Sequence, residues 1–362
     1  MTWLGDELGR IADDVPERDL GVRAIEVYRR RRRNLMAVAA AAVVVVTVLA
    51  GTVTIRLLPR HDAPDAARPV APPEQSVIDV SVEAGAEAAP LYVARSKGYF
   101  AAEGLTVRPV VKPTVMAVLP ELGGGTIDLA QTDYVSSFLV SQQIRGIDLK
   151  IVGGLHQAEP GSLALVVRPG SGIRTVADLK GKRIAVTNPS GLGALSLVAM
   201  MKRAGLDRYD AKLVIQQDTD MVGGLDDGKY QAALLPEPFV AASVHQGRAR
   251  VLQKLMTGEV AGLPSAGWTA EADWIRANPR TLAAFQRALA KARRLIASDP
   301  AQAVAVLPQY LKVTAGDLDR VALGTYPAEL DVRGLQRLAD MARRYTFLRK
   351  SFDVRSIVAS GE

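Results

Sequence analysis

The sequence predicts an α/β fold with two lobes, preceded by a transmembrane helix near the N-terminus. Three observations lead to this prediction. Leu35–Ile55 contains no charged residue and, as a helix, is long enough to cross a bilayer. From Val77 onward short apolar runs alternate with helical patterns, which is typical of α/β domains with largely parallel sheets. The chain beyond that point is long enough to bury two separate cores.

The charges around the uncharged stretch predict its orientation. Arg29–Arg33 precede it directly, and far fewer basic residues follow it closely. The positive-inside rule therefore places residues 1–34 in the cytoplasm as a tail, residues 35–56 across the membrane, and the rest of the chain outside. A cleaved signal peptide is the alternative, with a cut in Ala63–Ala67.

The extracytoplasmic part divides into a spacer and two lobes. Residues 57–76 are rich in proline and predict an extended, semi-rigid spacer. We expect residues 77–168 to form the first part of lobe 1, residues 169–264 to form lobe 2, and residues 265–362 to return to lobe 1 and end in helices. Two long helices are expected in that last part, at 278–297 and 332–345.

Composition excludes several classes of protein. The chain has no cysteine, which excludes disulfides, thiolate metal sites, a cysteine nucleophile and a lipoprotein anchor. Its net charge of +7 is spread along the chain, so we expect no nucleic-acid partner. The three histidines lack the spacing of metal ligands, and no G-x-S-x-G elbow is present. We therefore predict no metal, no cofactor and no catalytic residue.

Two acidic residues follow predicted strands and are candidates for ligand contact. Asp133, with Thr132 beside it, comes after the short strand 127–129. Glu237 comes after the strand 232–235 and is held between two prolines, which stiffen the turn. Loops that follow strand ends in α/β sheets face the ligand crevice. A plain surface turn is the alternative for each.

Four further residues complete the candidate site. Ser190 and Gly191 open a predicted helix, where free N–H groups could bind an anionic or carbonyl oxygen. A simple N-cap by Ser190 is the alternative, and the partial glycine pattern is a weak match to a dinucleotide fingerprint. His156 could face a cleft. Trp268 could stack on a ligand or serve as a core or hinge residue.

Four segments of the chain resemble a known family. They are PLYVARSKGYFAAEGLTVRPV (90–110), GTIDLAQTD (125–133), LVVRPGSGIRTVADLKGKRIAV (165–186) and LLPEPF (234–239). Together they resemble the substrate-binding proteins of ABC transporters for aliphatic sulfonates, taurine, nitrate and the thiamine-precursor pyrimidine. The resemblance covers residues 75 to 350 and says nothing about which ligand is bound.

The resemblance implies a periplasmic-binding-protein fold of type II, in which two lobes are joined by two crossing strands and the ligand lies between them. We expect hinges near Val166 and Gly267. Relatives are usually cleaved periplasmic proteins or lipoproteins, whereas we expect this chain to keep its transmembrane helix. One enzyme, the fungal-type pyrimidine synthase, resembles these proteins but relies on a cysteine-rich motif that is absent here.

The expected function is that of a membrane-anchored, extracytoplasmic receptor and not an enzyme. It would deliver a small polar or anionic solute, such as a sulfonate, nitrate or a thiamine precursor, to an ABC importer. The expected partners are the small-molecule ligand, an ABC permease and ATPase, and the lipid bilayer through residues 35–55. We expect the folded region to be a monomer. A membrane sensor with a solute-binding ectodomain and a pyrimidine-precursor synthase are the alternatives.

Overall fold

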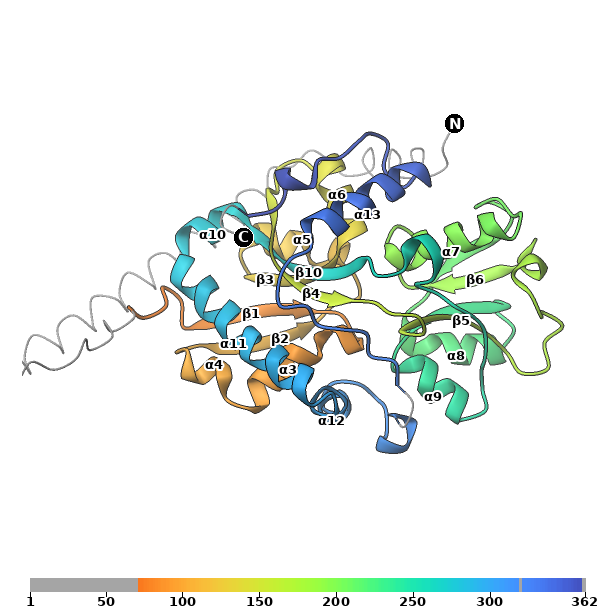
Figure 1. Cartoon of the computed structure of the whole chain (residues 1–362), viewed down its shortest axis with the longest axis horizontal. Coiled ribbons are helices and arrows are strands. Elements are labelled where there is room, and N and C mark those ends of the chain that lie inside the picture. The colour runs from red at the N-terminus through yellow and green to blue at the C-terminus, as the bar shows by residue number, and fades with distance from the viewer. Residues whose placement is uncertain (1–70, 319–320, 360–362) are drawn as a thin grey trace, which may run out of the picture. The chain divides into compact units, whose positions relative to one another are not determined.

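The computed structural model describes residues 71–318 and 321–359. These residues form two five-stranded sheets, and the first sheet combines strands from the start of the described region with one strand from much later in the sequence (Figure 1). Strand β1 lies between β2 and β3 and runs parallel to both, whereas β10 runs antiparallel to β3 and β4. In sheet order the strands are β2 (Thr106–Val111), β1 (Val77–Val82), β3 (Leu129–Asp133), β10 (Pro264–Glu271) and β4 (Leu149–Gln157).

The second sheet repeats this plan. Strand β6 lies between β7 and β8 and runs parallel to both, and β5 runs antiparallel to β8 and β9. In sheet order the strands are β7 (Lys212–Ile215), β6 (Arg183–Val186), β8 (Ala232–Pro236), β5 (Leu163–Val167) and β9 (Arg250–Lys254). The expectation of largely parallel sheets is therefore wrong for β5 and β10. Each is the first strand after the chain has crossed from the other lobe, and each enters its sheet in the reverse direction.

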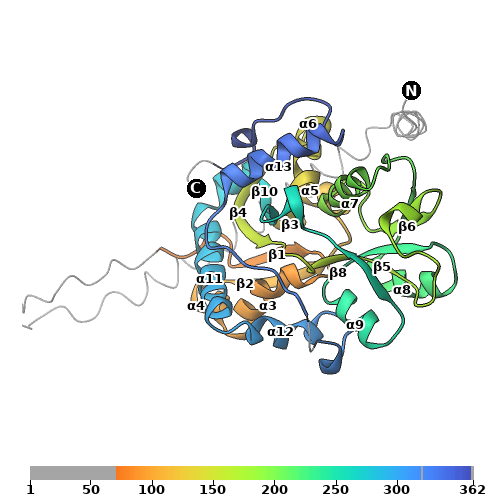
Figure 2. The ribbon, with the colours of Figure 1, turned by 45° about the vertical axis from the view of Figure 1, so that its right-hand side comes forward.

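Helices cover both faces of each sheet (Figure 2). One face of the first sheet carries α3 (Ala89–Ser96), α4 (Tyr99–Ala102), α11 (Pro279–Ser298) and α12 (Ala301–Val306), and the other carries α5 (Val115–Gly124), α6 (Tyr134–Gln143) and α13 (Val332–Arg344). Helix α10 (Ala272–Ala277) follows β10. The second sheet carries α7 (Leu192–Arg203) on one face and α8 (Asp218–Asp226) and α9 (Phe239–His245) on the other.

The long helix α11 shows why these elements form. Pro279 begins it, as expected for a residue with a fixed φ and no N–H to lose. Its buried side chains Leu282, Phe285, Leu289 and Ile296 recur at helical spacing and form one apolar face. That face packs against the first sheet, where Phe285 contacts Trp268 edge-on with ring centroids 5.2 Å apart. The two long helices expected from the sequence are confirmed to within one residue at each end.

The segments that cross between the lobes differ from the expected hinges. The chain passes from the first to the second sheet through residues 158–162 and returns through residues 255–263. Val166 and Gly267 instead lie inside paired strands, where neighbouring strands restrain the backbone. Strand β5 pairs only within the second sheet, so by strand pairing that sheet begins at Leu163, before the boundary predicted at residue 168.

The end of the predicted spacer also packs against the folded region. Glu74 accepts the backbone N–H of Thr281 at 2.8 Å, and the Arg280 side chain donates to the Pro72 carbonyl at 2.8 Å. Residues 72–75 therefore belong to the first lobe. The predicted membrane segment, Leu35–Ile55, lies outside the described residues. Within residues 71–318 and 321–359, no helix combines the length and hydrophobicity needed to cross a membrane.

Candidate ligand-binding cleft

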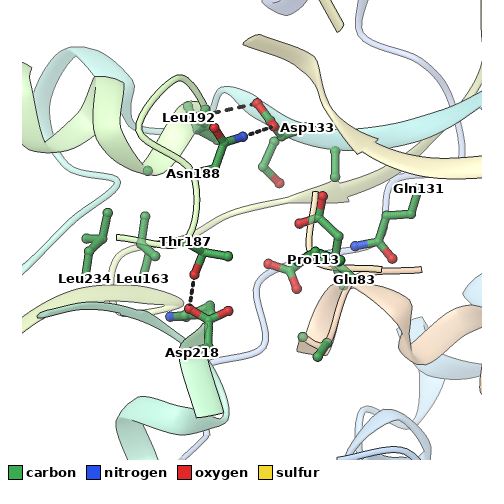
Figure 3. Close-up of a pocket in the computed structure, with 18 of the residues that line it drawn as sticks. Glu83, Pro113, Gln131, Asp133, Leu163, Thr187, Asn188, Leu192, Asp218 and Leu234 are labelled. Atoms are coloured by element: carbon green, nitrogen blue, oxygen red, sulfur yellow. Dashed lines mark hydrogen bonds between the residues drawn. The ribbon is translucent and has the colours of Figure 1, made fainter. Parts of the chain in front are cut away.

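A cavity of about 360 Å³ lies between the two sheets (Figure 3). In open α/β sheets the loops at the carboxyl ends of parallel strands meet in a crevice where the strand order reverses. Here that position is beside β1 in the first sheet and beside β6 in the second. The loops after these strands, 83–87 and 187–193, both line the cavity. Its volume falls within the usual range for a small-molecule site.

The first lobe contributes three carboxylates to the cavity. Glu83 directly follows β1, Glu87 lies in the short helix η1 (Ala86–Ala88), and Asp133 ends β3. Burial raises the pKa of the Glu83 carboxyl well above its usual range, and the negative charges of Asp133 and Glu87 raise it further. The negative charges of these acids therefore disfavour one another across the cavity.

The second lobe contributes a fourth carboxylate. Asp218 is the first residue of α8 and accepts a hydrogen bond from the Thr187 hydroxyl. Burial raises the pKa of Asp218 to about 7, and the charge of Glu87 in the other lobe adds to this rise, while the Thr187 hydrogen bond opposes it. In Figure 3, Glu83, Asp133 and Asp218 surround the cavity from both lobes.

The loop after β6 is organised by the side chain of Asn188. Its Oδ1 accepts the Ser190 N–H at 3.0 Å, and its Nδ2 donates to Ser136 Oγ at 2.8 Å and to an Asp133 oxygen at 3.3 Å. The N–H of Gly191 donates to the Asn188 carbonyl at 3.4 Å. A Cβ on Gly191 would lie 2.8 Å from Asn188 Nδ2, so a larger residue here would require the Asn188 side chain to shift.

Asp133 holds the two lobes together beside the cavity. Its Oδ1 caps α6 by accepting the Ser136 N–H at 3.0 Å and also accepts the Leu192 N–H at 3.3 Å, which begins α7 in the second lobe. Burial raises the pKa of Asp133, and these N–H donors oppose the rise. The two lobes therefore contact each other directly beside the cavity.

Two of the candidate residues from the sequence line this cavity, namely Asp133 and Gly191. Ser190 is not among the lining residues, and its N–H is bonded to Asn188. Thr132 has its side chain on the opposite face of β3, because successive side chains of a strand alternate. Its hydroxyl lies 2.9 Å from Ser137 Oγ. Ligand contact by any of these residues stays a prediction.

Glu237 lies next to the cleft but does not line it. Its carboxylate accepts the Ala241 N–H at 3.0 Å and the Ala322 N–H at 3.4 Å, and the residue is 4% exposed. Burial raises its pKa to about 7. Pro236, one residue earlier, does line the cavity. Glu237 is thus absent from the lining residues, and its carboxylate is bonded to two backbone N–H groups. Ligand contact by Glu237 stays a prediction.

His156 and Trp268 are structural as well. His156 Nε2 donates to the Leu323 carbonyl at 2.7 Å, and its Nδ1 lies 2.7 Å from Ser265 Oγ, so the ring joins β4 to the returning chain. Trp268 is buried against Phe285 and lines a separate cavity of about 320 Å³ within the first lobe. Neither residue is among those lining the cleft.

The polar residues that the sequence reasoning missed share a simple feature. Glu83, Asn188 and Asp218 each come within three residues of the end of a parallel strand. Gln131 stands two residues before Asp133 on β3, and the period of two in a strand places both on the cavity face. The signal in the sequence is a polar residue at or just after the end of a strand. A polar residue two positions earlier on the same strand lies on the same face.

Two sheets of the same strand order, with a lined cavity between their strand ends, define a two-lobed binding-protein fold. A solved alkanesulfonate-binding protein, SsuA from Xanthomonas axonopodis pv. citri bound to MOPS, has this fold. The two structures align with a TM-score of 0.66 and 22% identity over 80% of this chain and 99% of that one.

The NMT1/THI5 like family model matches residues 86–303, and the chain belongs to this family. A putative aliphatic sulfonates-binding protein of Escherichia coli strain K12 is 27% identical over 249 residues, which cover 67% of this chain and 76% of that protein. A pyrimidine phosphate synthase of Uromyces fabae, named 4-amino-5-hydroxymethyl-2-methylpyrimidine phosphate synthase, is 28% identical over 228 residues, covering 58% of this chain and 63% of the enzyme. Solute-binding proteins and this enzyme are thus both among the relatives of the chain.

Proposed function

We propose that this protein is a membrane-anchored, extracytoplasmic receptor that captures a small polar solute and delivers it to an ABC importer. The observation that carries the proposal is the cavity between two lobes, lined from both and flanked by the Asp133 contacts that join them. A receptor of this kind encloses its solute by closing one lobe on the other. The binding-protein names of its relatives support the same role.

The sequence supports the anchor. Leu35–Ile55 is uncharged and follows Arg29–Arg33, the arrangement of a helix that crosses the membrane with its N-terminus inside. Residues 57–71 would then link the membrane to the lobes. The receptor would act as a monomer beside the importer and in contact with its permease.

The first test asks what the receptor holds. Residues 71–362 form one compact unit and can be produced without the preceding segment. Native mass spectrometry of this fragment, followed by release and identification of any solute, should show one small molecule per chain. A protein that carries no solute, and that no solute in a broad polar panel stabilises against heat, contradicts a receptor function.

The second test concerns the anchor. Intact cells that express the full chain with an epitope at residue 1 are treated with external protease. We expect the lobes to be digested and the epitope to survive. Digestion of the epitope contradicts the orientation, and secretion of a chain that begins within Ala63–Ala67 shows a cleaved signal peptide instead.

A further inference from the structure

The charge of the cavity is its most distinctive property. Four carboxylates line it, from Glu83, Glu87, Asp133 and Asp218. Lys112 is the one basic side chain among the lining residues, all of which lie in the described part of the chain, and its Nζ is 2.5 Å from Glu121. The lining of the cavity therefore carries more acidic than basic side chains. Because burial raises the pKa of Glu83, Asp133 and Asp218, the negative charge of the cavity grows as the pH rises.

Three successive N–H groups at the start of α7 are already bonded within the protein. Ser190 donates to the Asn188 side chain, Gly191 donates to the Asn188 carbonyl, and Leu192 donates to Asp133. A carboxylate of the protein thus occupies the place where an anionic solute would be expected at a helix N-terminus. A sulfonate or nitrate bound at the Leu192 N–H would have to displace Asp133.

A separate observation at the same site points to a ligand with donor groups. Gln131 lines the cavity and is 3% exposed, and its Oε1 has no hydrogen-bond partner. In Figure 3 its amide extends from β3 to the cavity near Glu83. A buried acceptor without a partner is costly, and such groups in native proteins are commonly completed by a bound molecule. An N–H or O–H of a solute in the cavity would complete this one.

The remaining walls fit the carbon skeleton of an organic molecule. Leu163, Leu192 and Leu234 of the second lobe, with Pro113 of the first, supply apolar surface between the acids. Within the described residues, no group of three or more acidic, histidine or cysteine side chains is arranged to hold a metal ion. The site thus combines spaced acceptors with apolar walls, which suits an organic solute that carries separated donors.

We propose that the cleft selects a small organic cation, a solute with one or more protonated amine or amidine-type nitrogens, which the carboxylates of both lobes and the Gln131 amide oxygen receive. This inference rests on the proposed receptor function and deepens it. Acids from both lobes would meet the same cation, so binding the solute would also hold the lobes together. An anionic solute would gain nothing from the acids and would be repelled by them.

The test measures thermal unfolding of residues 71–362 at pH 8 and low salt, with each probe at 10 mM. The cations are 1,4-diaminobutane, agmatine and benzamidine. Their neutral counterparts are 1,4-butanediol and benzamide. The anionic probes are ethanesulfonate and nitrate. Ca²⁺, Mg²⁺ and Zn²⁺ test whether the carboxylates bind a metal ion instead. We expect at least one organic cation to raise the Tm by about 2 °C or more above its neutral counterpart. Salt at 0.5 M should reduce this rise, since it screens charges.

Two variants test whether the effect comes from the cavity. Asp218→Asn and Gln131→Leu should each remove most of the rise in Tm caused by the cation. Glu237→Gln is the matched control, since Glu237 is a buried acid that does not line the cavity, and it should keep the full rise. Circular dichroism of each variant without probe reports whether it folds, and if Asp218→Asn does not fold, Glu87→Gln takes its place.

The outcomes separate this inference from the receptor function. Stabilisation by ethanesulfonate or nitrate, equal to or above that by every cation, overturns the cation inference and leaves the receptor function standing. Stabilisation by a metal ion alone also overturns it, as does an organic cation effect that Asp218→Asn and Gln131→Leu both retain. If no probe stabilises the protein and no solute is recovered from it, both proposals fail.

Discussion

The cleft and the turn after β8 each contain a buried acid whose pKa is raised to about 7, and the two acids have different surroundings. Asp218 in the cleft has the Thr187 hydroxyl as its partner and faces other carboxylates across a cavity. Glu237 in the turn after β8 accepts two backbone N–H groups and is not among the residues that line the cavity. A raised pKa from burial therefore does not by itself mark a ligand site. The partners of the carboxylate and the space in front of it decide its role.

Substitution of Asp218 should weaken ligand binding, and substitution of Glu237 should leave it nearly unchanged. The relevant ligand is the organic cation that gives the largest rise in Tm. Asp218→Asn should lower the affinity for this cation by about thirtyfold or more at pH 8, because removing one partner of a buried charge pair costs about 2 to 5 kcal/mol. Glu237→Gln should bind within a factor of two of the natural protein. Calorimetry of both variants measures this. Equal losses in the two variants would mean that the distinction between the regions is wrong.

The comparison also predicts effects on stability. Glu237→Ala should lower the free energy of unfolding by about 1 to 3 kcal/mol at pH 6, because the N–H groups of Ala241 and Ala322 lose their acceptor. Asp218→Asn should leave stability unchanged or raise it at pH 8, because it removes one of several mutually repelling charges. Urea denaturation checks both. A loss of stability in Asp218→Asn as large as that in Glu237→Ala would assign Asp218 a structural role.

Affinity for a cation should depend on pH in a direction set by Asp218. Below its pKa of about 7 this carboxyl is protonated and attracts a cation less, so affinity should rise about tenfold from pH 6 to pH 8. The charged groups that face it across the cavity are Glu83, Glu87, Asp133 and Lys112. The rise should disappear in Asp218→Asn. Calorimetry at three pH values measures it, and an affinity that falls with pH would contradict the prediction.

Without a cation, the free energy of unfolding should fall as the pH rises, whereas the affinity for a cation should rise with pH. Free aspartate and glutamate titrate near pH 4, whereas Asp218 and Glu237 titrate at about 7 in the folded protein. Between these values the folded state binds protons that the unfolded state has lost. The free energy of unfolding should therefore fall as the pH rises from about 4 to about 7. The raised pKa values of Glu83 and Asp133 act in the same direction. Urea denaturation of the protein without probe checks the sign.

The smallest expected effect concerns the contact between lobes. Asn188→Ala removes the hydrogen bonds to Asp133 and Ser136 and should cost about 0.5 to 1.5 kcal/mol in closure. Affinity should fall by a few-fold while the folded lobes stay intact. Small-angle scattering of the protein without ligand should show a larger radius of gyration in this variant. Ser190→Ala keeps the Asn188 side chain and serves as the control.

Much of the fold could be predicted because the signals are local. Pro279 and the apolar face that follows it indicate α11, and the alternation of apolar runs indicates two α/β lobes. The direction of β5 and β10 could not be predicted, because it depends on which sheet each strand joins after the chain has crossed. The packing of residues 72–75 on α11 likewise depends on partners some 200 residues away.

The sequence by itself determined the two-lobed α/β architecture, the absence of cysteine chemistry and the family, since each follows from composition, periodicity or local sequence. It also indicated Asp133, because a polar residue at the end of a buried strand faces the crevice wherever the sheet forms. Only the tertiary structure decided that Glu237 turns away toward the N–H groups of Ala241 and Ala322, and that Asp218 joins acids from the other lobe. The charge of the cleft belongs to no single segment, because it arises where loops more than a hundred residues apart are brought around one cavity.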